Sequence, residues 1–204
     1  MDRVLTEERR LPRSFYARPA PVVAKALIGM RLVHRAPDGT AAGVIVETEA
    51  YRRTDPASHS FRGKTARNAV MFGRPGHAYV YFTYGMHWCF NVVTGKVDDG
   101  EAVLVRAVEP TAGVEHMARR RGLAKLRDLS RGPGRLAQAY AIGREHDGAD
   151  LVRGPLGIWR PPEKVRRRYR RIAAGPRIGI TRGVAAAWRF ATLDSPFVSG
   201  RPSR

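Results

Sequence analysis

The stretch Val44-Ile-Val-Glu-Thr-Glu-Ala-Tyr51 joins three β-branched aliphatic residues to two carboxylates and an aromatic ring. Such aliphatic residues favour extended strands, and residues two apart on a strand share a face. Glu47, Glu49 and Tyr51 are therefore expected on one side of a strand. A carboxylate at the end of a buried strand is costly unless it is paired or used in chemistry. The stretch thus predicts a buried strand that carries part of a functional site.

Further strand-like runs flank this stretch. Runs rich in Val, Ile, Tyr and Phe alternate with Gly, Pro and Asp clusters that are typical of turns. The turn residues Pro37-Asp-Gly-Thr40 predict a hairpin, and three later runs with short connections predict an antiparallel meander. We expect strands at 31–35, 42–51, 77–84, 88–94, 102–108 and 176–180, with Glu109-Pro110 ending the sheet.

Apolar residues at helical spacing complete the predicted fold. They indicate helices at 22–27, 111–121 and 134–142 and a helical turn at 184–190. The pattern predicts an α+β (mixed α/β) fold: a single domain over residues 13–204, built on a curved, mostly antiparallel sheet with surrounding helices and a protruding β-hairpin. Residues 1–12 are expected to be a flexible basic arm.

The charge balance is strongly basic, with 37 Lys+Arg against 18 Asp+Glu and a formal net charge of +19. Codon bias can favour Arg over Lys, but it does not explain a twofold excess of bases over acids. Such a field attracts polyanions, so nucleic acid is the leading partner and an anionic membrane the second. No long basic amphipathic helix supports the membrane alternative. Without an apolar span or a signal-peptide pattern, we expect a bacterial-type intracellular location, cytoplasmic or at the nucleoid, and no secretion.

Neither a metal nor a cofactor is expected. Cys89 is the only cysteine, which excludes an intrachain disulfide and a thiolate zinc cage. The six His residues show no HxxxH or HxH spacing. Glycine-rich phosphate-binding motifs of the GxxxxGK[ST] and GxGxxG types are absent, so nothing supports a bound nucleotide cofactor.

Arg106 is the candidate partner of the acidic strand. It interrupts the apolar run Val103–Val108, where an Arg either reaches solvent along its stem or pairs with a buried acid. Pairing with Glu49 would keep that carboxylate ionised, able to activate water and to stabilise an oxocarbenium ion. A two-carboxylate glycosidase site is disfavoured, because Glu47 and Glu49 lie side by side rather than on opposite sides of a scissile bond.

Three further positions have both a structural and a functional interpretation. Tyr84 lies at a hairpin tip beside Gly85 and is a candidate wedge into a base stack, the step that accompanies base flipping. His59 lies in a long polar loop, where a solvated ring is the ordinary case. Asn91 lies within an apolar strand, where it either bonds to backbone or contacts a base edge.

Several motifs, in order along nearly the whole chain, resemble the alkyladenine (3-methyladenine, or alkylpurine) DNA glycosylase family. The matching segments are Val46–Tyr51, Ala57–Ser60, Arg67-Asn68, Met71-Phe72, Pro75–Tyr81, Tyr84–Met86, Asn91, Val105–Pro110, Gly132–Leu136 and Arg177–Ile180. Many motifs in the right order are far more specific than any one of them. The resemblance implies a base-excision-repair enzyme, a monomer without cofactor that acts on double-stranded DNA containing damaged purines. The lesion class would comprise 3-methyladenine, 7-methylguanine, hypoxanthine and ethenoadenine.

The resemblance also implies residue roles. Glu49 would be the general base, with Arg106 and the main-chain carbonyl of Ile178 helping to hold the attacking water. Tyr51, His59, Tyr81 and Asn91 would form the base pocket, and Tyr84 and Met86 would insert into the DNA. Lys64, Arg67 and Arg135 would bind phosphates. It assigns no role to the basic stretch 165–171. The alternative function is a non-catalytic binder of structured nucleic acid, which would have no need of Glu49 and Arg106.

Overall fold

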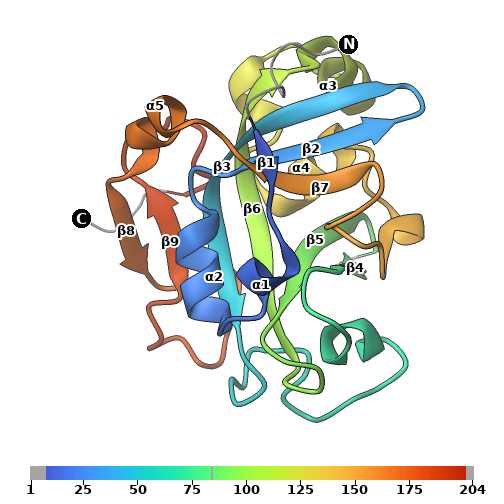
Figure 1. Cartoon of the computed structure of the whole chain (residues 1–204), viewed down its shortest axis with the longest axis vertical. Coiled ribbons are helices and arrows are strands. Elements are labelled where there is room, and N and C mark those ends of the chain that lie inside the picture. The colour runs from blue at the N-terminus through green and yellow to red at the C-terminus, as the bar shows by residue number, and fades with distance from the viewer. Residues whose placement is uncertain (1–7, 84, 201–204) are drawn as a thin grey trace.

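The computed structural model describes residues 8–83 and 85–200. Its centre is a long strand, β3 (Gly39–Tyr51), which lies between β2 (Arg31–Ala36) and β6 (Glu101–Ala112) in an antiparallel sheet. The strand order is β1-β7-β2-β3-β6-β5-β4, and a further pair joins β3 through β9. Figure 1 shows the sheet as a curled layer with helices around it. The other strands are β1 (Arg9–Arg10), β4 (Ala78–Thr83), β5 (His87–Thr94), β7 (Leu156–Arg160), β8 (Ile172–Gly175) and β9 (Arg189–Thr192).

The helices are short and pack on both sides of the sheet. α2 (Ala20–Leu27) has Pro19 at its N-cap and Pro21 in its first turn, where proline is tolerated, and it buries Val23, Ala24 and Leu27 against the sheet. The other α-helices are α1 (Arg13–Tyr16), α3 (Val114–Arg121), α4 (Pro133–Ala139) and α5 (Glu163–Arg166). The 3₁₀ segments are η2 (Ala69–Phe72), η3 (Leu126–Asp128), η4 (Arg144–His146) and η5 (Arg167–Tyr169).

These elements confirm the α+β class, the hairpin of β2 and β3, and the meander of β4, β5 and β6. The sheet does not end at Glu109-Pro110, because β6 continues to Ala112. Pro110 is tolerated there because it lies opposite Gly43, at a register shift in β3 where the ladder is already interrupted.

Two other predictions near the C-terminus are wrong. Residues 176–180 do not form a strand, because the N–H of Ile178 binds a side-chain carboxylate instead of a neighbouring strand. The segment 184–190 is not a helical turn; its end, from Arg189, enters β9 and pairs with β3.

The expected flexible arm over residues 1–12 is not observed at Arg9–Leu11. Arg9 and Arg10 pair with the end of β7, and Leu11 is buried in the core. Residues 1–7 lie outside the described residues, and so does Tyr84 at the tip of the β4–β5 hairpin.

Gly113 is the point at which the chain turns from β6 into α3. Its φ is +70°, and a Cβ would lie 1.8 Å from the carbonyl oxygen of Thr40. Gly122 at the other end of α3 has φ +58° and open space around a Cβ, so it makes a matched control.

We expect Gly113→Ala to lower the free energy of unfolding by about 3 kcal/mol or more, because it adds a backbone clash to the left-handed strain. Gly122→Ala should cost only the strain, about 1–2 kcal/mol. Urea unfolding of both variants measures the difference, and equal losses would show that the Thr40 contact is readily relieved.

Candidate active site

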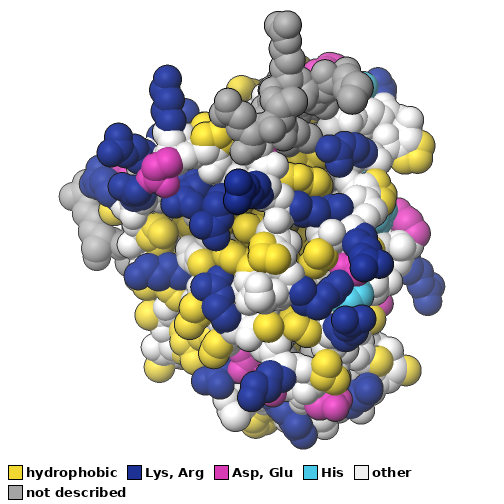
Figure 2. Space-filling model, viewed as in Figure 1, with side chains coloured by type: hydrophobic (Ala, Val, Ile, Leu, Met, Phe, Trp, Pro, Cys, Tyr) yellow, Lys and Arg dark blue, Asp and Glu magenta, His cyan; other side chains and the backbone are white. Residues whose placement is uncertain are grey.

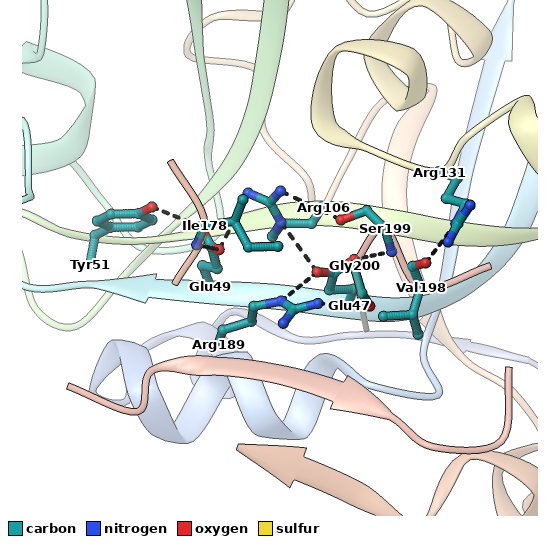
Figure 3. Close-up of polar contacts among 10 residues, drawn as sticks. All are labelled: Glu47, Glu49, Tyr51, Arg106, Arg131, Ile178, Arg189, Val198, Ser199 and Gly200. Atoms are coloured by element: carbon teal, nitrogen blue, oxygen red, sulfur yellow. Dashed lines mark hydrogen bonds and ion pairs between the residues drawn. The ribbon is translucent and has the colours of Figure 1, made fainter. Parts of the chain in front are cut away.

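Glu49 is fully buried near the end of β3, and three donors converge on its carboxylate. The Tyr51 hydroxyl donates to Oε2 at 2.8 Å, and the Ile178 N–H donates to Oε1 at 2.8 Å. Arg106 Nη1 lies 3.3 Å from the same Oε1. Figure 3 shows the three donors approaching Glu49 from different parts of the chain. The predicted pairing of Glu49 with Arg106 is thus present, together with two donors that were not expected.

Glu47 is also fully buried, but it is held entirely by the protein. Its Oε1 accepts from Arg189 Nε at 2.6 Å and from Arg106 Nε at 3.3 Å, and its Oε2 accepts from the Ser199 N–H at 2.6 Å. These contacts leave Glu47 enclosed by the protein, as expected of a structural residue (Figure 3). Sequence reasoning missed Arg189, although an Arg between Trp188 and Phe190 gave the same signal as Arg106 does in β6.

The acids determine how the neighbouring groups ionise. Burial alone would lower the pKa of Arg106, but Glu49 and Glu47 together raise it above its ordinary value. Burial, and then the charge of Glu49, raise the pKa of Tyr51. Arg106 is therefore cationic and Tyr51 is a phenol, so both can donate to Glu49.

A cavity of about 660 Å³ opens beside this cluster. All three donors to Glu49 line it, so the carboxylate lies directly behind its wall. The cavity is also lined by the four predicted base-pocket residues, Tyr51, His59, Tyr81 and Asn91. They come from the strands β3, β4 and β5 and from the loop that carries His59. A cavity of this size is typical of a small-molecule pocket.

His59 is fixed among the aromatic rings of the cavity. Its ring meets that of Tyr81 edge-on at 4.5 Å, and its Nδ1 lies 2.9 Å from the Tyr79 hydroxyl. Desolvation, and then the charge of Arg67, lower the pKa of His59. The expected solvated loop histidine is therefore an ordered, neutral ring at the cavity wall, with a hydrogen bond to a core tyrosine.

Asn91 is buried, and its amide is oriented by two main-chain carbonyls. Nδ2 donates to the Tyr79 oxygen at 3.1 Å and to the Cys89 oxygen at 3.4 Å. Because both partners are acceptors, the amide nitrogen must face them, and Oδ1 is left as the group free to meet a ligand. Asn91 therefore bonds to the backbone through Nδ2, as one interpretation of the sequence required, and keeps Oδ1 for a contact with a base edge, as the other required.

Arg177 supports the pocket from behind, and sequence reasoning did not identify it. Its guanidinium is buried, forms a bidentate ion pair with Asp55, and donates to the Ala50 carbonyl oxygen at 3.0 Å. The same group lies 4.7 Å from the Tyr51 ring centroid and 5.3 Å from that of Trp188. Arg177 therefore fixes the plane of Tyr51, while the next residue, Ile178, holds Glu49.

The residues expected to contact DNA lie around the mouth of the cavity or on the adjacent loops. Lys64, Arg67 and Arg135 are exposed, and Arg135 also lines the cavity at the start of α4. Arg67 Nη2 donates to the Phe82 carbonyl oxygen at 3.3 Å. Met86 is 67% exposed at the β4–β5 turn, where an inserting side chain would have to be. The prediction for Tyr84 lies outside the described residues.

Within residues 8–83 and 85–200, no group of three or more His, Cys, Asp or Glu side chains could hold a metal ion. Over the same residues, no helix is both long enough and apolar enough to cross a membrane.

The contrast between the two acids predicts different effects on stability. Glu47→Gln should lower the free energy of unfolding by about 3–5 kcal/mol, because it removes the charge that balances two buried arginines. Glu49→Gln should cost about 1 kcal/mol or less, because Arg106 keeps Glu47. Urea unfolding at neutral pH measures both, and an equal or larger loss for Glu49→Gln would overturn this division of roles.

Comparison with known proteins identifies the family of this chain. The model of the family described as Methylpurine-DNA glycosylase (MPG) matches residues 14–196. A relative from Granulibacter bethesdensis, named as a candidate 3-methyladenine DNA glycosylase, is 55% identical over 95% of this chain and 89% of its own. A relative from Methanoculleus marisnigri with the same name is 49% identical over 94% of this chain and 99% of its own. The chain therefore belongs to the methylpurine-DNA glycosylase family.

Proposed function

We propose that this protein is a monofunctional base-excision-repair DNA glycosylase. It flips an alkylated or deaminated purine out of duplex DNA, hydrolyses the N-glycosidic bond with water, and leaves an abasic site. The observation that carries this proposal is Glu49, a fully buried carboxylate whose three donors all line one cavity. A protein that only binds nucleic acid has no use for such a costly group.

Glu49 has the acceptor capacity needed to orient water. A carboxylate offers about four acceptor positions, and Tyr51, Ile178 and Arg106 occupy three of them. A water on the remaining position would be polarised toward C1′ of the flipped nucleotide, with the main-chain carbonyl of Ile178 as its second contact. The negative charge of Glu49 also stabilises the oxocarbenium ion that develops as the base leaves.

The aromatic groups suit a flipped purine that carries positive charge. Tyr51 and Tyr81 offer ring faces to a cationic base. A neutral His59 adds no positive charge that would repel this base. An alkylated purine such as 3-methyladenine or 7-methylguanine is already a good leaving group and needs little acid catalysis. The fixed amide of Asn91 would crowd the 2-amino group of guanine, which 7-methylguanine shares, so excision of that lesion would rely on its cationic leaving group. Neutral lesions of the same class, hypoxanthine and ethenoadenine, would obtain their proton through the pocket.

The lining of the cavity favours hydrolysis over a lyase reaction. None of the described residues that line it is a lysine, so no amine is in position to form a Schiff base. Outside the cavity, Tyr84 and Met86 would fill the space of the extruded nucleotide, and Lys64, Arg67 and Arg135 would hold phosphates. We propose that the enzyme acts as a monomer.

We expect Glu49→Gln to slow base release by roughly 10²–10⁴-fold under single-turnover conditions, because general base catalysis is lost. Binding to a duplex that contains hypoxanthine should stay within a few-fold, since Gln keeps the shape of the pocket. Gel-shift and excision assays on the same duplex make the comparison. Retained excision would refute the mechanism, and loss of both activities would indicate a collapsed pocket.

His59 should give the enzyme a lesion-dependent pH profile. Its pKa lies below the ordinary value of 6.5, so the ring gains a proton only as the pH falls below 6.5. The imidazolium formed there would repel a cationic base but not a neutral one. We expect kcat/KM for 7-methylguanine to fall more steeply with acid than kcat/KM for hypoxanthine.

The matched variant is His59→Gln, which cannot gain a charge. It should give parallel acid limbs for the two lesions, because no positive charge then develops at position 59. An unchanged difference between the lesions in His59→Gln would assign the effect to another group.

A further inference from the structure

The face of the protein behind the catalytic cavity carries a second, smaller hollow. Thr48 points toward α2, where its hydroxyl donates to the Ala24 carbonyl oxygen at 2.9 Å. Its neighbour Glu49 points toward the catalytic cavity, and successive residues of a strand face opposite sides. The second hollow, of about 300 Å³, is bordered by α2, the end of β7 and the α5–η5 segment, so it lies on the side of the sheet away from Glu49.

Five basic side chains line this hollow, which we call the basic groove: Arg18, Lys25, Arg160, Arg166 and Arg170. Figure 2, which looks onto α2, shows Lys and Arg side chains gathered over this face. Among the described acids, Glu163 pairs with Arg166 at 2.7 Å and with Arg170. None of the described acids pairs with Arg18, Lys25 or Arg160. The basic groove is therefore strongly cationic.

Arg18 is positioned in advance for an anion. Its guanidinium stacks on Phe15, with Cζ 4.4 Å from the ring centroid, and its Nε donates to the Phe15 carbonyl oxygen at 2.8 Å. Its Nη2 is buried and has no hydrogen-bond partner among the described residues, so any phosphate would be met by the part of the guanidinium that faces solvent. A side chain held in this way loses little entropy on binding, and its remaining donors suit the oxygens of a phosphate.

The floor of the basic groove decides between two kinds of polyanion. Phe15, Ile28, Met30 and Tyr169 are 8%, 6%, 6% and 3% exposed, and only Ala26 and Ile172 add partly exposed apolar surface, so the groove has no deep apolar pocket for the anchor side chain of an acidic peptide. The most exposed side chains of the groove are charged: Lys25, Arg160 and Arg170. A regular row of phosphates gains from such a surface through counterion release, without needing apolar contact.

We propose that the basic groove binds the backbone of a second segment of duplex DNA while the first segment occupies the catalytic face. The proposal rests on the proposed function only in taking DNA as the polyanion. Because the two faces are opposite, both duplexes can be bound at once, and the protein can pass directly from one to the other. The stretch 165–171, which the catalytic site does not use, then supplies part of the basic groove and so takes part in the transfer between duplexes.

The test is the rate at which the full-length protein releases a fluorescent undamaged duplex, measured against increasing unlabelled duplex. Direct transfer makes this rate rise in proportion to competitor, whereas simple dissociation does not. The groove variant is Lys25→Gln/Arg160→Gln/Arg170→Gln. The control is Lys96→Gln/Arg144→Gln/Arg153→Gln, which removes the same charge from exposed residues that line neither cavity.

We expect the slope of release rate against competitor concentration to be at least fivefold smaller in the groove variant than in the wild type. In the control variant the slope should stay within twofold of the wild-type value. Single-turnover excision should be unchanged in both variants, which also shows that they are folded. Equal slopes in the two variants, or a wild-type rate independent of competitor, would overturn the proposal. Release accelerated by polyglutamate but not by duplex would overturn it in favour of an acidic protein. Absence of excision in the wild type would refute the proposed function without altering this readout.

Discussion

The structure depends on one shared cation, Arg106, which bridges the two buried acids of β3. Its Nε contacts Glu47 and its Nη1 contacts Glu49, each at 3.3 Å. Two carboxylates two positions apart on one strand would repel each other if they were buried without compensation. Arg189, brought by β9, supplies the second positive charge, so two acids face two bases. The cost of burying four charges is thereby offset, chiefly through Glu47, which contacts both arginines.

This balance ties the site to the C-terminal part of the chain. The Ser199 N–H binds Glu47, Arg189 Nη2 donates to the Gly200 carbonyl oxygen at 3.1 Å, and Arg131 Nε donates to that of Val198 at 2.7 Å. Glu47 thus joins β3, β6, β9 and the final segment, and it fixes the strand on which Glu49 is carried (Figure 3). The two acids thus differ in position: Glu47 is enclosed by the protein, and Glu49 lies behind the cavity wall.

Much of the sheet and part of the site could be predicted because their signals are local. The alternation along residues 44–51 identified β3, and an Arg within an apolar run identified the partner of Glu49. The C-terminal third was predicted poorly. Residues 176–180 carry a strand-like pattern, yet their backbone binds the Glu49 side chain, and Arg177 is held by Asp55 from a distant loop. No local periodicity reports contacts between residues more than a hundred positions apart.

The sequence by itself determined which groups are present: a strand with two acids, a cation to pair with them, aromatic rings, and a basic surface suited to DNA. The reason is that burying a carboxylate or an arginine inside an apolar run demands a partner, whatever the partner's position. Only the tertiary structure decided which acid does which task. Glu47 is enclosed by Arg189 and the Ser199 N–H, whereas Glu49 meets Tyr51 and Ile178 at the wall of an open cavity. That difference arises from the packing of β9 and the final segment against β3.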